Sequence, residues 1–153
     1  MIEYEFLTSV VTDEDITDIR RLLKESVLDG TDITPEHIVH VARRNHLLVA
    51  REAEPGLRSR IVGAGILATL ALLTGGVGRI EGITVSPTHV EFGLADGLVL
   101  RLIEQARHIG LTRVVLDSSS FELRTALRLD ELAGHLGFVR HGTDELLLEL
   151  NVH

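Results

Sequence analysis

The stretch from Val85 to Leu102, VSPTHVEFGLADGLVLRL, joins the end of a strand-like segment to an apolar-periodic helix through a short polar link. The first turn of a helix has unpaired N–H groups and a partial positive charge, which together bind phosphate and other anions. A small residue such as Gly93 lets the backbone approach such a ligand closely. The turn carries Glu91 and Asp96 and no lysine or arginine, so it is either an anion site made of backbone N–H groups or a purely structural turn.

Other groups that could do chemistry carry weaker signals. The sequence has no cysteine, which excludes disulfides, zinc–thiolate sites and a thiol nucleophile. His37 and His40 lie three positions apart on one short predicted helix, but no third ligand is signalled nearby, so a surface helix is favoured and no metal site is predicted. The segment GGVGRIEG (75–82) lacks the lysine–serine pair of a nucleotide-binding loop, and we interpret it as a turn that joins strands.

The composition is that of one globular domain, which we take to span residues 1–153. The net charge of −8 argues against binding to nucleic acid, and it is compatible with cationic partners such as amines, although a solvated acidic surface is the commoner reason. The start of the chain lacks the basic residues of a secretory signal, and the longest apolar stretch is glycine-rich and short for a membrane span. We therefore expect a soluble, cytoplasmic protein without a membrane partner.

The periodicity of apolar residues predicts an alternation of strands and helices. Thr12 and Asp15 form a helix-capping signal, and Thr34 caps a second helix that begins at Pro35. The predicted strands cover 2–8, 46–52, 61–73, 78–85, 112–118 and two segments within 138–152, and the predicted helices cover 15–28, 35–45, 93–110 and 122–137. The order β-α-α-β-β-β-α-β-α-β-β indicates an α/β (α+β) domain.

This order resembles that of the GNAT superfamily of acyl-CoA-dependent N-acyltransferases over nearly the whole chain. The resemblance rests on ITVSPTHVEFGLADGLVLRLIEQAR (83–107), IGLTRVVLDSSS (109–120) and LDELAGHLGFVRHGTDELLLEL (129–150), the last of which includes the Gly137–Phe138 pair. It implies a GNAT-like twisted mixed sheet of six to seven strands with about four helices. Two central parallel strands, 78–85 and 112–118, are expected to splay apart at their C-terminal ends.

The resemblance also implies acetyl-CoA as the co-substrate and an amine as the acceptor. In the family, the acyl-pantetheine arm lies between the splayed strands and pairs with the backbone of the first one, here Ile83, Thr84 and Val85. The pyrophosphate lies on the turn and helix start, here Val90, Glu91, Phe92, Gly93, Leu94, Ala95 and Asp96.

The turn departs from the family motif, which is Arg or Gln, two residues, Gly, one residue, then Gly or Ala. Gly93 and Ala95 fit this motif, whereas Val90 takes the place of the Arg or Gln. Phe92 and Asp96 take places that often carry Lys or Arg in the family. Phosphate binding would therefore depend on backbone N–H groups and would act against repulsion from nearby carboxylates.

Amine acylation needs a base that removes a proton from the acceptor and a group that protonates the departing thiolate. Glu81 is the predicted base, because it precedes the turn at the same parity as Ile83 and Val85; the alternative is an ion pair with a basic neighbour. The family's usual acid is a tyrosine at the position of Ala133. Ser119, within the run Ser118–Ser120, is the predicted substitute, and His135 is a further alternative.

Two functions from different classes fit these residues. The first is an N-acetyltransferase that acts on a primary amine of a small molecule or peptide, with a homodimer as an open alternative to a monomer. The second is a catalytically degenerate GNAT-fold module that binds a ligand or a protein. Gly93, Ala95 and Glu81 favour the enzyme. The residues that favour the binding module are Val90, Glu91, Asp96 and Ala133.

Overall fold

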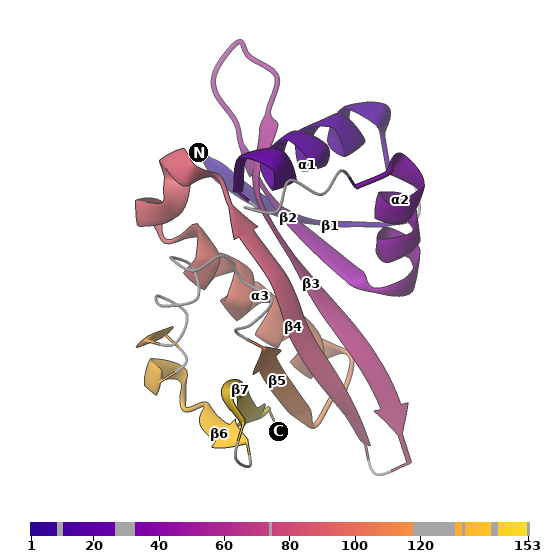
Figure 1. The fold of residues 1–153 in the computed structure, drawn as a ribbon, viewed down its shortest axis with the longest axis vertical. Coiled ribbons are helices and arrows are strands. Elements are labelled where there is room, and N and C mark those ends of the chain that lie inside the picture. The colour runs from indigo at the N-terminus through magenta and orange to yellow at the C-terminus, as the bar shows by residue number, and fades with distance from the viewer. Residues whose placement is uncertain are drawn as a thin grey trace.

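In the computed structural model of the chain, the described residues form one twisted mixed sheet of seven strands in the order β1-β2-β3-β4-β5-β7-β6 (Figure 1). The structure describes residues 1–8, 11–26, 33–73, 75–117, 131–132, 134–141 and 144–152. Among the strand pairs in this part of the chain, β4 and β5 are parallel and the others are antiparallel. The predicted fold class is confirmed.

The strands are β1 (Ile2–Leu7), β2 (His46–Glu52), β3 (Arg60–Leu72), β4 (Gly75–Val85), β5 (Arg113–Asp117), β6 (Val139–His141) and β7 (Asp144–Asn151). The helices are α1 (Asp13–Ser26), α2 (Pro35–Arg44), the 3-10 helix η1 (Pro87–Phe92) and α3 (Leu94–His108). Residues 131–132 and 134–136 are also helical, within the predicted last helix.

Two segments differ from the elements predicted from the sequence. The predicted polar link after Val85 contains the helix η1, and β4 begins at Gly75 rather than at Gly78. Gly78 therefore lies inside β4 rather than at its start, and a Cβ atom there would lie 2.8 Å from side-chain atoms of both Leu67 and Leu111. The glycine that suggested a turn serves instead to let these two leucines pack against the strand.

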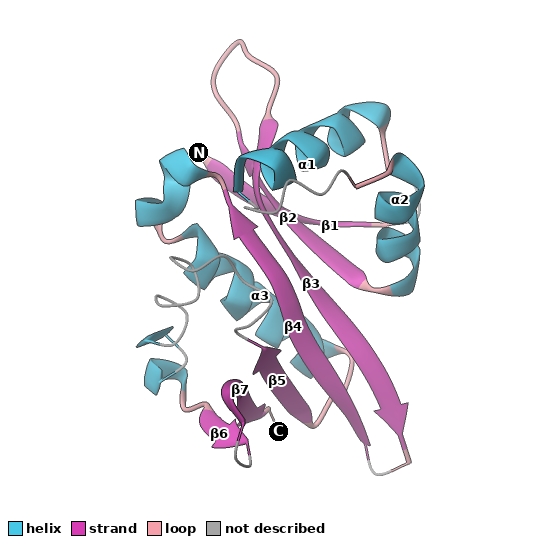
Figure 2. Cartoon of the chain, in the orientation of Figure 1, coloured by secondary structure: helices cyan, strands magenta, loops and turns pink. Residues whose placement is uncertain are grey.

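Helices lie on both faces of the sheet (Figure 2), and each face has an apolar core. Helix α3 packs on one face through a stripe of fully buried residues that includes Leu98 and Leu102. Helices α1 and α2 pack on the other face through Leu22 and Ile38, against Val49 of β2. Among the described residues, no helix is long and apolar enough to cross a membrane.

An ion pair with β2 and a hydrogen bond from the start of β3 hold α1 on the sheet. The helix begins where the Thr12 hydroxyl accepts a hydrogen bond from the backbone N–H of Asp15. Arg51 of β2 donates two hydrogen bonds, of 2.8 and 3.1 Å, to the Asp15 carboxylate, and these bonds hold the Asp15 pKa below its ordinary value. One turn further on, the Asp18 carboxylate accepts the backbone N–H of Ile61. Both aspartates are nearly buried, so these contacts determine where α1 lies on the sheet.

Replacing Asp15 by Asn is expected to lower the free energy of unfolding near neutral pH by about 1–3 kcal/mol, because Arg51 loses a charged acceptor in a nearly buried position. Since the Asp15 pKa is lower in the folded state, the carboxylate stabilises the fold above its unfolded pKa of about 3.9. This stabilisation is lost as the pH falls through the folded pKa.

Urea unfolding at a series of pH values measures both effects. The loss of stability below about pH 4 should be smaller in the Asp15→Asn variant than in the wild type. Asp13→Asn is the control, because Asp13 is an exposed acid in the same turn of α1. Identical pH slopes for the wild type and the Asp15→Asn variant would contradict the assignment.

Candidate active site

The parallel pairing of β4 with β5 stops before β4 ends. Its last pair is Ile80 with Leu116, whereas β4 continues to Val85 and stays paired with β3 along its other edge. Among the described residues, β4 therefore extends beyond its pairing with β5, as the expected splay of the two central strands requires. One edge of β4 between Glu81 and Val85 is therefore free of β5, beside the start of α3.

A β-bulge interrupts β4 within this splayed part. Ala64 pairs with Thr84 but Ile66 pairs with Glu81, so β4 has one more residue than β3 between the two pairs. The additional residue lies in Gly82–Ile83, where Gly82 has φ of 65°, in the left-handed region that favours glycine. A glycine inside a strand pattern is typical of a bulge, so the sequence does carry a signal for it.

The bulge corrects the prediction that Glu81 shares a face with Ile83 and Val85. Ile83 and Val85 belong to the core under α3, whereas Glu81 lies opposite Ile66, which packs against the core under α1 and α2. The Glu81 side chain is 36% exposed, and its carboxylate lies 3.6 Å from the guanidinium of Arg79. Glu81 thus faces the side of α1 and α2, and it forms the ion pair that was the alternative to a role as base.

Ile83, Thr84 and Val85 are the residues expected to contact a pantetheine arm. Of these, Val85 has its backbone N–H and carbonyl on the edge of β4 that faces away from β3. The Ser86 N–H donates to the Val62 carbonyl of β3 at 2.8 Å. Hydrogen-bonded and non-hydrogen-bonded pairs alternate in an antiparallel ladder. The backbone groups of Thr84 therefore bond to β3, whereas those of Val85 point away from β3. The Val85 carbonyl accepts a hydrogen bond of 3.2 Å from the hydroxyl of Ser26, at the end of α1. Helix α1 therefore reaches the splay itself.

The turn after β4 leads into an open N-terminus of α3. The backbone of Val90, Glu91 and Phe92 belongs to η1, and Gly93 follows with φ of 72°. A Cβ atom at Gly93 would have no described atom within 4 Å. Gly93 is the N-cap residue of α3 and has no side chain to accept the first N–H groups of the helix. This backbone has the room and the donors that an anion requires.

The first turn of α3 also carries a negative charge. Leu94 and Ala95 turn their side chains into the core, so only their backbone is available to a ligand. One carboxylate oxygen of Asp96, Oδ1, is buried and has no hydrogen-bond partner among the described residues. An acid at this position stabilises the N-terminus of the helix, and it also repels a phosphate that binds there.

A chain of side-chain hydrogen bonds ties η1 to β2. The His89 Nε2 atom bonds to the carboxylate of Glu52, and the Nδ1 atom lies 2.9 Å from the Thr88 hydroxyl, which in turn lies 3.1 Å from that of Ser86. The bond from His89 holds the Glu52 pKa below its ordinary value. Sequence reasoning missed this link because its two ends lie 37 positions apart.

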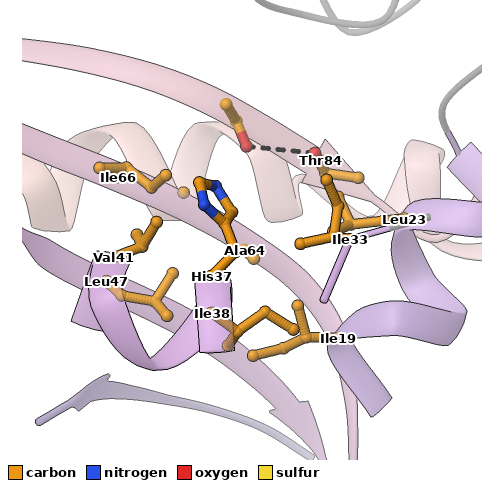
Figure 3. A pocket seen from close by; sticks show the side chains of 12 residues that line it. Ile19, Leu23, Ile33, His37, Ile38, Val41, Leu47, Ala64, Ile66 and Thr84 are labelled. Atoms are coloured by element: carbon orange, nitrogen blue, oxygen red, sulfur yellow. Dashed lines mark hydrogen bonds between the residues drawn. The ribbon is translucent and has the colours of Figure 1, made fainter. Parts of the chain in front are cut away.

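A cavity of about 130 Å³ lies between α1, α2 and the sheet, on the face that carries Glu81 (Figure 3). Figure 3 shows the His37 ring directed into it, near Ala64, Ile66 and Thr84. The Thr84 hydroxyl donates to the Gly82 carbonyl at 3.1 Å. The remaining lining residues are Ile19, Leu23, Ile33, Ile38, Val41, Leu47 and Gly65. His37, predicted to be a surface residue, is exposed as a whole but has its ring at this cavity.

Several predicted site residues cannot be placed. Ser119, with Ser118 and Ser120, lies outside the described residues, and so does Ala133. His135 is exposed on the short helical segment 134–136. Within the part of the chain that the structure describes, no group of three or more His, Asp or Glu side chains could hold a metal ion.

A model of the acetyltransferase (GNAT) family matches residues 14–138. The chain therefore belongs to the GNAT family of acetyltransferases. No curated protein matches the sequence significantly.

Solved structures of the same fold cover nearly the whole chain. An acetyltransferase from Trypanosoma brucei is 25% identical, with a TM-score of 0.70 over 94% of this chain and 96% of that one. A chain of the NatC complex bound to Gag peptide and CoA is 17% identical, with a TM-score of 0.73 over 99% of both chains. The Salmonella typhimurium protein yncA, solved with acetyl-CoA, is 15% identical, with a TM-score of 0.66 over 100% of this chain and 95% of that one. The last two show the fold alone.

Replacing His89 by Ala is expected to raise the Glu52 pKa toward its ordinary value, because the hydrogen bond from His89 is the largest influence that lowers it. The lowered pKa stabilises the fold above the unfolded pKa of Glu52, and this contribution is lost as the pH falls through the folded pKa. An NMR titration of the Glu52 carboxyl carbon measures the shift. His108→Ala, at an exposed position at the end of α3, is the control. A Glu52 pKa that stays the same in the His89→Ala variant would contradict the assigned bond.

Proposed function

We propose that the chain transfers the acetyl group of acetyl-CoA to a primary amine of a small molecule or peptide. The observation that carries this proposal is the end of strand pairing at Ile80 and Leu116, which leaves an edge of β4 open beside the N-terminus of α3. Membership of the acetyltransferase family supports it. The NatC and yncA structures, solved with CoA and acetyl-CoA respectively, support the identity of the donor.

The donor is assigned to the side of β4 that faces β5. In this proposal, the pantetheine arm lies along the splayed edge and bonds to backbone groups near Val85. The pyrophosphate lies at the open backbone of Gly93–Ala95, at the start of α3, where N–H groups bind it without a side-chain cation.

The acceptor is assigned to the opposite face of β4, beside the cavity under α1 and α2. Its amine nitrogen attacks the thioester carbonyl carbon, the carbon–sulfur bond breaks, and CoA leaves as a thiolate. Glu81 accepts the proton released by the amine, directly or through water, since its carboxylate lies on this face and is accessible.

The departing thiolate needs little help. Thiols ionise at about pH 8–9, so the CoA thiolate is a tolerable leaving group near neutral pH. It then takes a proton from water or from a hydroxyl, and Ser119 stays the proposed hydroxyl. A general acid typically contributes about 10²–10⁴-fold to the rate, so a site without the family's tyrosine would be slower and still active.

The second candidate is a binding module that does not catalyse. The observation that favours it is Asp96, whose carboxylate occupies the first turn of α3 and stabilises that helix end without any phosphate. Titration of the purified protein with acetyl-CoA and with CoA by calorimetry separates the two candidates, because only the enzyme requires the donor to bind.

Replacing Glu81 by Gln is expected to lower kcat by about 10²–10⁴-fold and to leave the affinity for acetyl-CoA unchanged, because the donor contacts β4 through the backbone. Steady-state release of CoA, measured with a thiol reagent across the pH range, gives the rate. Glu104→Gln, at an exposed position of α3, is the matched control. Full turnover of the Glu81→Gln variant at every pH would remove Glu81 as the base.

Replacing Asp96 by Asn is expected to tighten the binding of acetyl-CoA by about three- to tenfold at low salt, because it removes a negative charge from the phosphate site and keeps the side chain's shape. The gain should shrink as salt is added, since ions screen the repulsion. Calorimetry at two ionic strengths measures it, with Asp13→Asn as the control for net charge. Equal affinities at low salt would mean that the pyrophosphate does not lie at the start of α3.

A further inference from the structure

We infer that the cavity under α1 and α2 is the specificity pocket of the acceptor, and that the acceptor is a primary amine carrying a branched apolar group of four or five carbons. The inference rests on the proposed acetyl transfer and names the class of amine. The inference is based on the position, the size and the chemistry of this cavity. Aliphatic side chains form most of its wall, and the other lining residues include His37, Gly82 and Thr84.

The position of the cavity fits an acceptor because Gly82 and Thr84 line it from the splayed part of β4. The same strand that would hold the thioester on its edge therefore forms the floor of the cavity. Gly82 has no side chain, so no side chain fills the cavity at the bulge of β4. Glu81 precedes it on the same face, so an amine whose apolar group fills the cavity would hold its nitrogen near the proposed base.

The size of the cavity limits the group that it admits. Its volume is about 130 Å³. An engineered apolar cavity of roughly 150 Å³ in another protein binds benzene, which has six carbons. A branched aliphatic group of four or five carbons therefore fits here, whereas an aromatic or longer group would need more room.

The chemistry of the cavity excludes a polar group. Its wall is aliphatic, and the Thr84 hydroxyl is already bonded to the Gly82 carbonyl. A buried hydroxyl or amide of an acceptor would find few partners there, which costs binding energy. Among the described residues that line the cavity, His37 alone has a titratable side chain. His37 is exposed as a residue while its ring lines the cavity, so the cavity opens to solvent beside it.

The test compares amines that differ in one feature. Leucine amide carries an isobutyl group, asparagine amide carries a polar group of similar shape, and glycine amide carries none. With acetyl-CoA as the donor, kcat/KM for leucine amide should exceed that for either of the other two by about tenfold or more. The release of CoA measures the rate.

Two variants place the selectivity in the cavity. Ala64→Leu fills it and should lower kcat/KM for leucine amide by about tenfold or more, while glycine amide changes by less than about threefold. Ala68→Leu is the matched control, since Ala68 lies on the same strand and face and does not line the cavity. Leu23→Ala enlarges the cavity and should shift the preference toward phenylalanine amide, which keeps the test decisive if the Ala64→Leu variant folds poorly.

The outcomes separate this inference from the proposed function. Equal rates with leucine, asparagine and glycine amides would overturn the inference and leave acetyl transfer intact. Selectivity that neither variant alters would show the cavity to be a packing void and would also overturn the inference. If no amine is acetylated, the proposal of acetyl transfer fails. Calorimetry of leucine amide in the presence of CoA then tests whether the cavity binds the amine. Binding that Ala64→Leu removes would then support the pocket, and the absence of binding would overturn it.

Discussion

Strand β4 loses its parallel partner after Ile80, and the rest of the candidate site depends on how its backbone is satisfied beyond that point. Buried backbone N–H and carbonyl groups need hydrogen-bond partners. One edge of β4 keeps the ladder with β3 up to Ser86, and on the other edge the hydroxyl of Ser26 reaches the Val85 carbonyl from the end of α1. The end of β4 thus contacts α1 as well as leading into the start of α3.

The bulge at Gly82 decides which side chains of β4 face α3 and which face α1 and α2. Without it, strict alternation would place Glu81 on the same face as Ile83, in the core under α3. The additional residue turns Ile83 into that core and leaves Glu81 on the face of α1 and α2. In the proposed arrangement, β4 separates the donor from the acceptor, with its backbone edge facing the first and the side chains of Glu81 and Thr84 facing the second. The ion pair of Asp15 with Arg51 and the hydrogen bond from the Ile61 N–H to Asp18 hold α1 over this second face.

Local patterns in the sequence predicted most of the elements and their order, because the apolar periodicity of each helix and strand reflects burial that the structure retains. The face of β4 that carries Glu81 was predicted wrongly. Side chains alternate between the two faces of a strand, and this alternation is interrupted where a bulge adds a residue. Gly82 inside the strand was the available signal. The link from His89 to Glu52 and the apolar surroundings of His37 could not be predicted, because they depend on strands and helices far apart in the sequence. Ser119 stays a prediction.

The charge of the protein acts in opposite directions on the two proposed substrates. With a net charge of −8, the chain repels an anionic donor and attracts an ammonium group at distances up to a Debye length, about 10 Å in ordinary buffer. Donor affinity must then come from short-range contacts with backbone N–H groups at Gly93 and the start of α3, which work at hydrogen-bond distance and need no cationic side chain. The long-range field acts on the net charge of the acceptor, so it cannot distinguish amines of equal charge from one another. In the proposed function, discrimination among amines of equal charge therefore falls to the apolar cavity, where burial and fit act at short range.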